Sequence, residues 1–431
     1  MTFCTPSVKR HNHFTYIALP PKNNGRNQSQ TTIIKLAYNH PQRRINGLAL
    51  CFLLGLSQVM TYPRYTKLID SLPATVPFVG PEAQERERGD AFLARLGANE
   101  SVFGPSPAAI KAMADAAADI WQYGDPTSHE LSAALAAHHN ISVDNLVIGE
   151  GIDGLLCYIV RMLVGPGDAV VTSDGAYPTF NYHVLGFGGD LHKVPYCDDH
   201  EDPMALMKKA AQVGAKLVYL ANPDNPMGTW HSRETITNAL QALPEGCLLV
   251  LDEAYIEFAP DGTAPALDID DPRLIRMRTF SKGYGMAGAR VGYAIGQRDL
   301  IRSFDKIRNH FGMNRAAQAG ALAALNDPKW LDVVRAQVAR SRTSIDKIAR
   351  NNGLSTLPSA TNFVAVDCQQ DGAFAQRVLA ALLKQGLFVR MPFVAPQNRC
   401  IRISAGTVEN MVLLASALPL ALRQARLGQP Q

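Results

Sequence analysis

The sequence predicts an α/β fold with a large, mostly parallel, doubly wound sheet and a second, smaller α/β domain. Short apolar runs of strand character alternate with helical stretches between residues 145 and 295, which is typical of βαβ units. Several of these runs end in polar or charged residues, and strand ends are where α/β enzymes place their chemistry. A length of 431 residues is enough for one large and one small buried core.

Composition and charge exclude several classes of function. The formal net charge is +4, but residues 1–59 hold seven basic residues and no acidic one, so the rest of the chain carries −3. A mildly acidic globular part without clustered Lys and Arg argues against nucleic-acid binding. The seven cysteines are scattered without a Cys-x-x-Cys pair, so we expect neither disulfides nor a zinc site, and a reducing compartment such as the cytoplasm.

The first 59 residues contain no pattern that fits a fold or a catalytic site. An apolar run at residues 45–56 is too short to span a bilayer and lies too far from the N-terminus for an ordinary signal peptide. We therefore expect an extension upstream of a natural start near Met60. A targeting segment and a structural arm remain alternatives.

The next two elements are a helix and a glycine-rich turn. Pro107 favours a helix start, and the sequence predicts a helix over residues 108–120. A strand at 145–148 then leads into Gly149-Glu150-Gly151-Ile152-Asp153-Gly154, which matches the G-x-G-x-x-G pattern of dinucleotide-binding proteins. The same geometry, a glycine turn opening a helix, binds any phosphate through free backbone N–H groups. A nicotinamide site would leave the lysine and carboxylate motifs described next without a role.

The remaining elements continue the alternation toward the C-terminus. A long helix is expected around residues 330–351, followed by strands within 359–366 and 400–407. The expected strands of the large sheet are 145–148, 169–172, 191–195, 216–220, 247–251, 274–279 and 291–295.

Three motifs at the ends of these strands carry the predicted chemistry. Lys282 lies between Thr279, Ser281 and glycines, with Arg290 eight positions on, an arrangement suited to a Schiff-base amine beside a phosphate clamp. On its own, this stretch also fits a solvated lysine in a surface loop. Asp252 and Tyr255 follow the apolar run that ends at Leu251, so a carboxylate could face a pyridinium nitrogen and a phenol could donate to a ring oxygen.

The third motif is Asn222-Pro223-Asp224-Asn225-Pro226-Met227-Gly228, in which Asn225 offers an amide to the same ring oxygen. In order and spacing, the three motifs resemble those of the fold-type I pyridoxal-phosphate (PLP) aminotransferases, most closely the histidinol-phosphate aminotransferase group. The likeness covers roughly residues 93–418. It implies PLP as cofactor and a homodimer with shared active sites.

The resemblance also implies roles for further residues. Gly151, Ile152 and Asp153 would cradle the cofactor phosphate, Phe180 would stack on the ring, and Tyr123 would reach the phosphate of the partner subunit. Substrate would be held by Asn99, Asn362 and Arg402, with Arg390 and Arg399 as competitors for the role of Arg402. A planar guanidinium suits a bidentate grip on a carboxylate.

The resemblance divides the chain into an extension (1–59), an arm with part of the small domain (60–127), a large PLP-binding domain (128–325) and a C-terminal small domain (326–431). The expected reaction moves an amino group from an amino acid or amino-phosphate donor to a 2-oxo acid, with 2-oxoglutarate as the expected acceptor. A threonine-phosphate-type decarboxylase is the alternative, because the two reactions differ mainly in substrate pose. Gly97, Ser101 and Val102 depart from the usual histidinol-phosphate pattern, which leaves the donor open. No metal and no membrane segment are expected.

Overall fold

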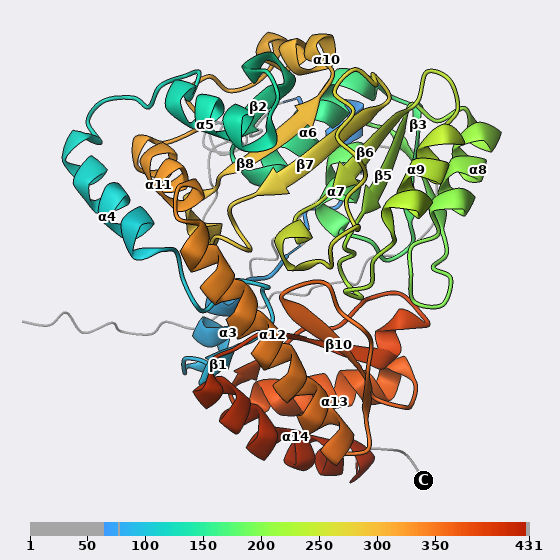
Figure 1. Ribbon diagram of the computed structural model, residues 1–431. Helices are drawn as coiled ribbons and strands as arrows, with labels where there is room; N and C mark the ends of the chain where they lie inside the picture. Colours follow the sequence, from blue (N-terminus) through green and yellow to red (C-terminus); the bar gives the residue numbers. More distant parts are fainter. Residues whose placement is uncertain (1–63, 76–77, 428–431) are drawn as a thin grey trace, which may run out of the picture. The chain divides into compact units, whose positions relative to one another are not determined.

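A computed structural model describes residues 64–75 and 78–427 of the chain. The predicted extension at residues 1–59 lies outside the described residues, and so does the expected start at Met60. Two short helices, α2 (Lys67–Ser71) and α3 (Pro81–Arg88), open the described part (Figure 1).

The largest element is a seven-stranded sheet in the order β2-β8-β7-β6-β5-β3-β4. Only β8 runs antiparallel to its neighbours; the other strands share one direction. The predicted strands are confirmed to within one or two residues. The strands are β2 (Leu146–Gly149), β3 (Ala169–Ser173), β4 (Asp190–Val194), β5 (Leu217–Ala221), β6 (Leu248–Asp252), β7 (Leu274–Thr279) and β8 (Gly292–Gly296).

Helices cover both faces of this sheet (Figure 1). Along β5, Leu217 and Tyr219 pack on one face with α6 and α7, whereas Val218 and Leu220 pack on the other with α8 and α9. Because successive side chains of a strand point to opposite faces, a strand covered on both sides must be apolar throughout. This explains the continuous apolar runs in the sequence. The helices are α6 (Gly151–Leu163), α7 (Pro178–Gly186), α8 (Pro203–Val213), α9 (Arg233–Gln241) and α10 (Arg298–Ser303).

A third group of helices packs at the β2 edge of the sheet. The predicted helix at 108–120 is α4 (Pro107–Ala116) with a 3₁₀ turn at Ala117–Asp119, and it begins with Ser106 as N-cap and Pro107 in the first turn. Helices α5 (His129–His139) and α11 (Arg315–Leu325) complete the group. Their buried side chains share one core with residues of β2 and β8.

The C-terminal part forms a separate apolar core around a three-stranded antiparallel sheet, in the order β12-β10-β9. Helix α12 (Pro328–Asn351) leads from the large sheet to this part (Figure 1). Strand β1 (Ala94–Arg95) pairs with β11 (Leu387–Phe388) there, so chain segments from both ends meet. The other elements are β9 (Ser355–Thr356), β10 (Phe363–Asp367), α13 (Gly372–Lys384), β12 (Cys400–Ser404) and α14 (Val408–Leu427). The exact domain boundaries at 127/128 and 325/326 stay predictions.

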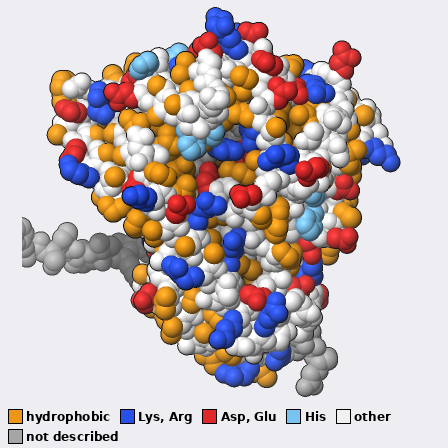
Figure 2. Space-filling model, viewed as in Figure 1, with side chains coloured by type: hydrophobic (Ala, Val, Ile, Leu, Met, Phe, Trp, Pro, Cys, Tyr) orange, Lys and Arg blue, Asp and Glu red, His pale blue; other side chains and the backbone are white. Residues whose placement is uncertain are grey.

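The surface of the described residues agrees with the charge argument. On the face drawn in Figure 2, basic and acidic side chains are interspersed, and the described residues form no broad area of one charge there. Within residues 64–75 and 78–427, no helix is long and apolar enough to cross a membrane.

Candidate active site

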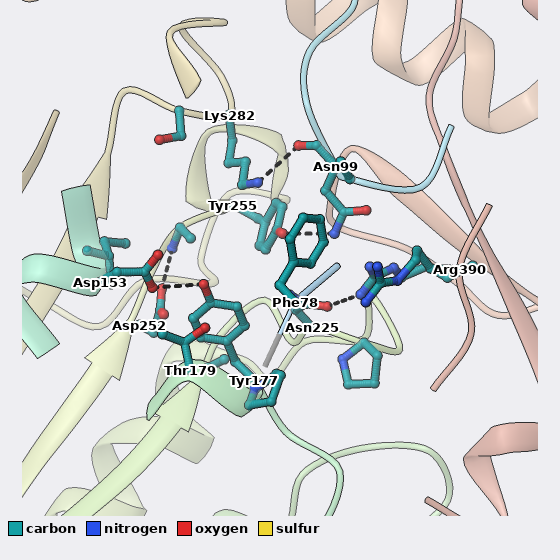
Figure 3. Close-up of a pocket in the computed structure, with 18 of the residues that line it drawn as sticks. Phe78, Asn99, Asp153, Tyr177, Thr179, Asn225, Asp252, Tyr255, Lys282 and Arg390 are labelled. Carbon is teal, nitrogen blue, oxygen red and sulfur yellow. Dashed lines mark hydrogen bonds between the residues drawn. The ribbon is translucent and has the colours of Figure 1, made fainter. Parts of the chain in front are cut away.

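A pocket of about 510 Å³ lies at the carboxyl ends of β5, β6 and β7, where the first turn of α6 and the loops at residues 98–100 and 390–393 also converge. Figure 3 shows its lining side chains pointing toward one another from these elements. This is the position at which doubly wound sheets bind ligands. The predicted site residues that line the pocket are Asn99, Ile152, Asp153, Asn225, Asp252, Tyr255, Thr279, Ser281, Lys282, Arg290 and Arg402.

Lys282 projects into the pocket from the loop after β7 (Figure 3). Its Nζ donates to the backbone oxygen of Asn99 at 3.0 Å and lies 5.6 Å from the centre of the Tyr255 ring. Burial, together with the positive charge of Arg402, lowers the pKa of Lys282 from 10.5 to about 8. A sizeable fraction of the amine is therefore neutral near pH 8, as a nucleophile or base requires.

The two carboxylates at the end of β6 face opposite sides of the sheet. Glu253 turns away from the pocket and accepts hydrogen bonds from Arg276 and Arg278 in a buried ion-pair network. Asp252 faces the pocket, where burial raises its pKa to about 6. Strand alternation thus separates a structural carboxylate from one available to a ligand.

Asp252 is held by a partner that sequence analysis missed. The Tyr219 hydroxyl donates to Asp252 Oδ2 at 2.7 Å, and the Ala254 N–H donates to Oδ1 at 2.9 Å. Tyr219 is fully buried and lies on β5, where Ala221 pairs with Asp252 in register. Because residues two apart share a face, the pairing of β5 with β6 would have identified Tyr219 as a neighbour of Asp252.

Tyr255 keeps its phenol proton available. Its hydroxyl accepts a hydrogen bond from Asn99 Nδ2 at 3.1 Å, and Asn99 Oδ1 in turn accepts from Ser404. Burial raises the pKa of Tyr255 to about 12, so the proton stays on the oxygen. The Asn99 side chain lines the pocket but is engaged with Tyr255 and Ser404, so its contact with substrate stays a prediction.

The glycine turn before α6 forms an anion cradle, as the phosphate interpretation requires. Gly151 has φ +78°, and an added Cβ would overlap the Arg290 guanidinium. The residue before it, Glu150, makes no side-chain capping bond, and Ile152 and Asp153 of the first turn of α6 line the pocket. The first N–H groups of this helix are therefore available to an anion. Arg290 Nη1 donates to Ser281 Oγ at 3.4 Å, and Ser281 also bonds Thr279.

Phe180 lies outside the pocket, so its stacking on the cofactor ring stays a prediction. Its ring is fully buried in the core and stacks on Tyr219 with centroids 4.6 Å apart, outside the pocket lining. The aromatic residue that lines the pocket is Tyr177, whose hydroxyl donates to Asp153 Oδ1 at 2.8 Å. Tyr177 precedes α7, whereas Phe180 lies in its first turn on the face that packs against the sheet.

Arg402 is a half-buried arginine whose guanidinium has no anionic partner among the described residues. Its Nη1 donates to Asn225 Oδ1 and its Nη2 to the Gly97 oxygen, but its buried Nε has no hydrogen-bond partner within the described chain. Burial lowers its pKa to about 10. An uncompensated buried charge favours an anionic ligand.

The two competing arginines are placed differently. Arg390 lines the pocket, donates to the Val79 oxygen at 3.0 Å and lies over the Phe78 ring. Arg399 lies outside the pocket lining, in ion pairs with Asp199 and Asp367. Arg402 and Arg390 therefore remain as candidates for a substrate anion.

Two further predicted residues lie outside the pocket of their own chain. Asn362 is buried beside it, donates to the Asn99 oxygen at 3.0 Å and leaves its Oδ1 without a partner among the described residues. Tyr123 is 77% exposed and contacts the Phe311 ring at 4.7 Å. An exposed aromatic pair cannot serve its own pocket.

Residues 93–418 match the family model of aminotransferase class I and II. The chain belongs to this family. It is therefore a PLP-dependent transaminase of fold type I, as the three motifs predicted. The expected α/β fold with a mostly parallel central sheet is confirmed as well.

Several similar proteins are named histidinol-phosphate aminotransferase. Histidinol-phosphate aminotransferase of Moorella thermoacetica is 32% identical over 81% of this chain and 90% of its own length. The enzyme of the same name from a Jannaschia species is 35% identical over 77% of this chain and 92% of its own length. The crystal structure of histidinol-phosphate aminotransferase from Sinorhizobium meliloti, in complex with pyridoxal-5'-phosphate, has 53% identity and a TM-score of 0.82 over 84% of this chain and 99% of that one.

The pocket of this aminotransferase fits PLP in three independent respects. The cradle at Gly151 and Arg290 suits a phosphate, and the neutral form of Lys282 suits attachment to an aldehyde. Burial raises the pKa of Asp252, and a positively charged pyridinium beside it would lower that pKa again and form an ion pair.

Proposed function

We propose that this aminotransferase moves an amino group from an amino acid or amino-phosphate donor to a 2-oxo acid, with 2-oxoglutarate as acceptor. The observation that carries the proposal is the convergence on one pocket of a half-buried lysine of lowered pKa, a buried carboxylate and a half-buried arginine whose Nε has no partner among the described residues. The relatives named above share the histidinol-phosphate aminotransferase name, which favours transamination over decarboxylation. We also propose that the enzyme works in the cytoplasm.

When bound, PLP withdraws electrons from the donor Cα and stores the amino group between the two half-reactions. Lys282 is the residue that would hold the cofactor, and its Nζ would then serve as the base that takes up and returns the Cα proton of the donor. The Asn99 oxygen accepts from Nζ and keeps it on the pocket side. Asp252 would keep the ring nitrogen protonated, and Tyr255 with Asn225 would bind the ring hydroxyl.

Arg402 decides which bond at Cα is broken. By binding the donor carboxylate or its equivalent anion, it would orient the donor so that the Cα–H bond faces Lys282. Asn225 supports this geometry because its Oδ1 accepts from Arg402 Nη1. Loss of carbon dioxide would require the donor to leave that orientation.

The donor itself is a narrower proposal. Gly97 lies so close to Phe388 and Arg390 that an added Cβ would be 2.9–3.0 Å from their side chains. The asparagine usual at this position in the resembling group would not fit without rearrangement. We therefore propose that histidinol phosphate is at most one of several donors, with Arg390 available for a second anionic group.

The reaction type can be tested by product analysis. A screen of amino acids and phosphorylated amines with 2-oxoglutarate is expected to yield the matching oxo product and one glutamate per donor consumed, without stoichiometric carbon dioxide. Carbon dioxide equal to donor loss, with no glutamate, would replace the proposal by the decarboxylase. Exclusive use of histidinol phosphate would overturn only the proposed breadth of donors.

We propose further that the active form is a homodimer in which Tyr123 enters the pocket of the partner. Tyr123 and Phe311 are 77% and 54% exposed, and the nearby Ile120 and Trp121 are exposed as well. Large exposed apolar side chains in one region mark an association surface. Their exposure supports contact with a second copy of this chain.

This arrangement predicts complementation between two defective variants. Tyr123→Ala and Lys282→Ala are each expected to be impaired, but a mixed dimer has one site with both native residues. Refolding the two variants together should recover activity well above either alone. If the mixture stays at the summed level of its components although mixed dimers form, Tyr123 does not act across an interface.

A further inference from the structure

Two buried carboxyl groups that the reaction does not use lie directly beneath the loop that carries Asn225. Glu201 and Asp224 are only 1% and 2% exposed. The Glu201 oxygens accept from the Ala221 N–H at 3.0 Å and from Ser173 Oγ at 2.6 Å. The Asp224 oxygens accept from the Tyr196 hydroxyl and the Met227 N–H, both at 2.9 Å.

The two side chains are close enough for a hydrogen bond with each other. Two ionised carboxylates are acceptors only, so a bond between them requires a proton on one of the two oxygens. Within residues 64–75 and 78–427, neither group takes part in an ion pair that would neutralise a second negative charge. Burial raises the pKa of both carboxyl groups, that of Asp224 to about 6.

Neither His231 nor Arg402 forms an ion pair with these two carboxyl groups. His231 Nε2 lies 2.7 Å from the Glu201 backbone oxygen and so carries the proton of a neutral ring, because burial lowers the pKa of His231. Arg402 acts on Asp224 only at longer range, while its Nη1 binds Asn225. The titratable or charged side chains that act on the pair from neighbouring elements are Tyr196, His200, Tyr219, His231, Tyr255 and Arg402.

The loop that this pair supports carries Asn225, which contacts Arg402 directly. Asp224 accepts from the Met227 N–H with its side chain and from the Gly228 N–H with its backbone oxygen, and its own N–H bonds the Thr229 oxygen. These bonds close a tight loop with Asn225 at its tip, against Arg402. Displacing Asp224 would therefore displace Asn225 and release Arg402.

We propose that Glu201 and Asp224 share one proton and together act as positioning residues, which hold Asn225 against Arg402 and so keep the carboxylate site formed. The assignment of Arg402 to a substrate carboxylate rests on the proposed function, whereas the shared proton does not. Removing the proton would leave two like charges side by side in a buried site, which is strongly unfavourable. The loop then opens, and substrate binding weakens.

The first test uses the cofactor-free protein, so it is independent of activity. Because the folded-state pKa of the pair is raised, the native protein holds a proton that the unfolded chain releases above pH ~4.5. The stability from this proton is therefore lost as pH rises. Glu201→Gln keeps the shape and a donor toward Asp224 but cannot titrate. Between pH 5 and pH 8, the melting temperature of wild type should fall by roughly 2 °C or more relative to that of Glu201→Gln.

If the melting temperatures of wild type and Glu201→Gln change equally with pH across this range, the pair does not share a proton. Glu245→Gln, in an exposed loop, is the control and should follow wild type. If Glu201→Gln fails to fold, Asp224→Asn carries the same comparison, because it also supplies a non-titrating donor.

The second test concerns positioning. With glutamate as donor, KM of the wild type should rise by up to about tenfold per pH unit above the titration of the pair, whereas kcat changes little. Glu201→Gln should flatten this rise, and Glu245→Gln should retain it. A KM profile unchanged by Glu201→Gln would show that the pair does not govern Arg402. Absence of any transamination in wild type would instead refute the proposed function and leave the melting result standing.

Discussion

Replacing Lys282 by alanine is expected to abolish transamination, with a loss of at least ~10⁴-fold in kcat. The change removes the amine that attaches the cofactor and the base that moves the Cα proton. The structure offers no second buried lysine among the residues that line the pocket. Fold and melting temperature of the cofactor-free protein should be retained, because removing a buried amine of lowered pKa relieves a desolvation cost.

Steady-state assays and PLP absorbance measure this effect. Lys208→Ala, on the exposed side of α8, is the matched control and should behave as wild type. Turnover of the Lys282 variant within tenfold of wild type would remove Lys282 from both roles.

Replacing Asp252 by alanine is expected to lower kcat by about 10²–10³-fold while PLP still binds. The phosphate cradle and Lys282 remain in place, but the charge that keeps the ring nitrogen protonated is lost. Asp252→Asn should show a similar loss, since an amide preserves the shape but not the charge. Near-native turnover of either variant would exclude Asp252 from this function.

The adjacent carboxylate provides the contrast for this prediction. Glu253→Gln breaks a buried network with Arg276 and Arg278 on the other face of the sheet, which should cost about 3–5 kcal/mol of stability. Its folded fraction should turn over as wild type. Measuring melting temperature and kcat together for both positions separates the structural carboxylate from the one that serves the reaction.

The sequence predicted most of the site because strand ends and motif spacing are local properties. Asp252, Asn225 and Lys282 each follow an apolar run, and parallel strands bring such positions to one edge of the sheet. The sequence alone did not predict that Tyr177 lines the pocket and that Phe180 does not. That outcome depends on α7 beginning at Pro178, and helix boundaries are uncertain from sequence by more than the one residue that matters here.

Contacts between distant segments could not be predicted from the sequence, for a different reason. Glu201 and Asp224 meet only after β5 and the loop that follows it are in place, and nothing in either local pattern indicates a buried acid pair. Tyr219 lies within an apolar run and looks like core packing until its register with β6 is known. Side-chain pairs of this kind require the fold.

The most direct test of the central claim is to locate the cofactor on the chain. The holoenzyme is treated with borohydride, which fixes the carbon–nitrogen link between PLP and its lysine, and is then digested and analysed by mass spectrometry. We predict that the added pyridoxyl-phosphate mass lies on the peptide that contains Lys282, and that a prior incubation with a productive amino donor prevents the labelling. Labelling of another lysine with Lys282 unmodified would contradict the account.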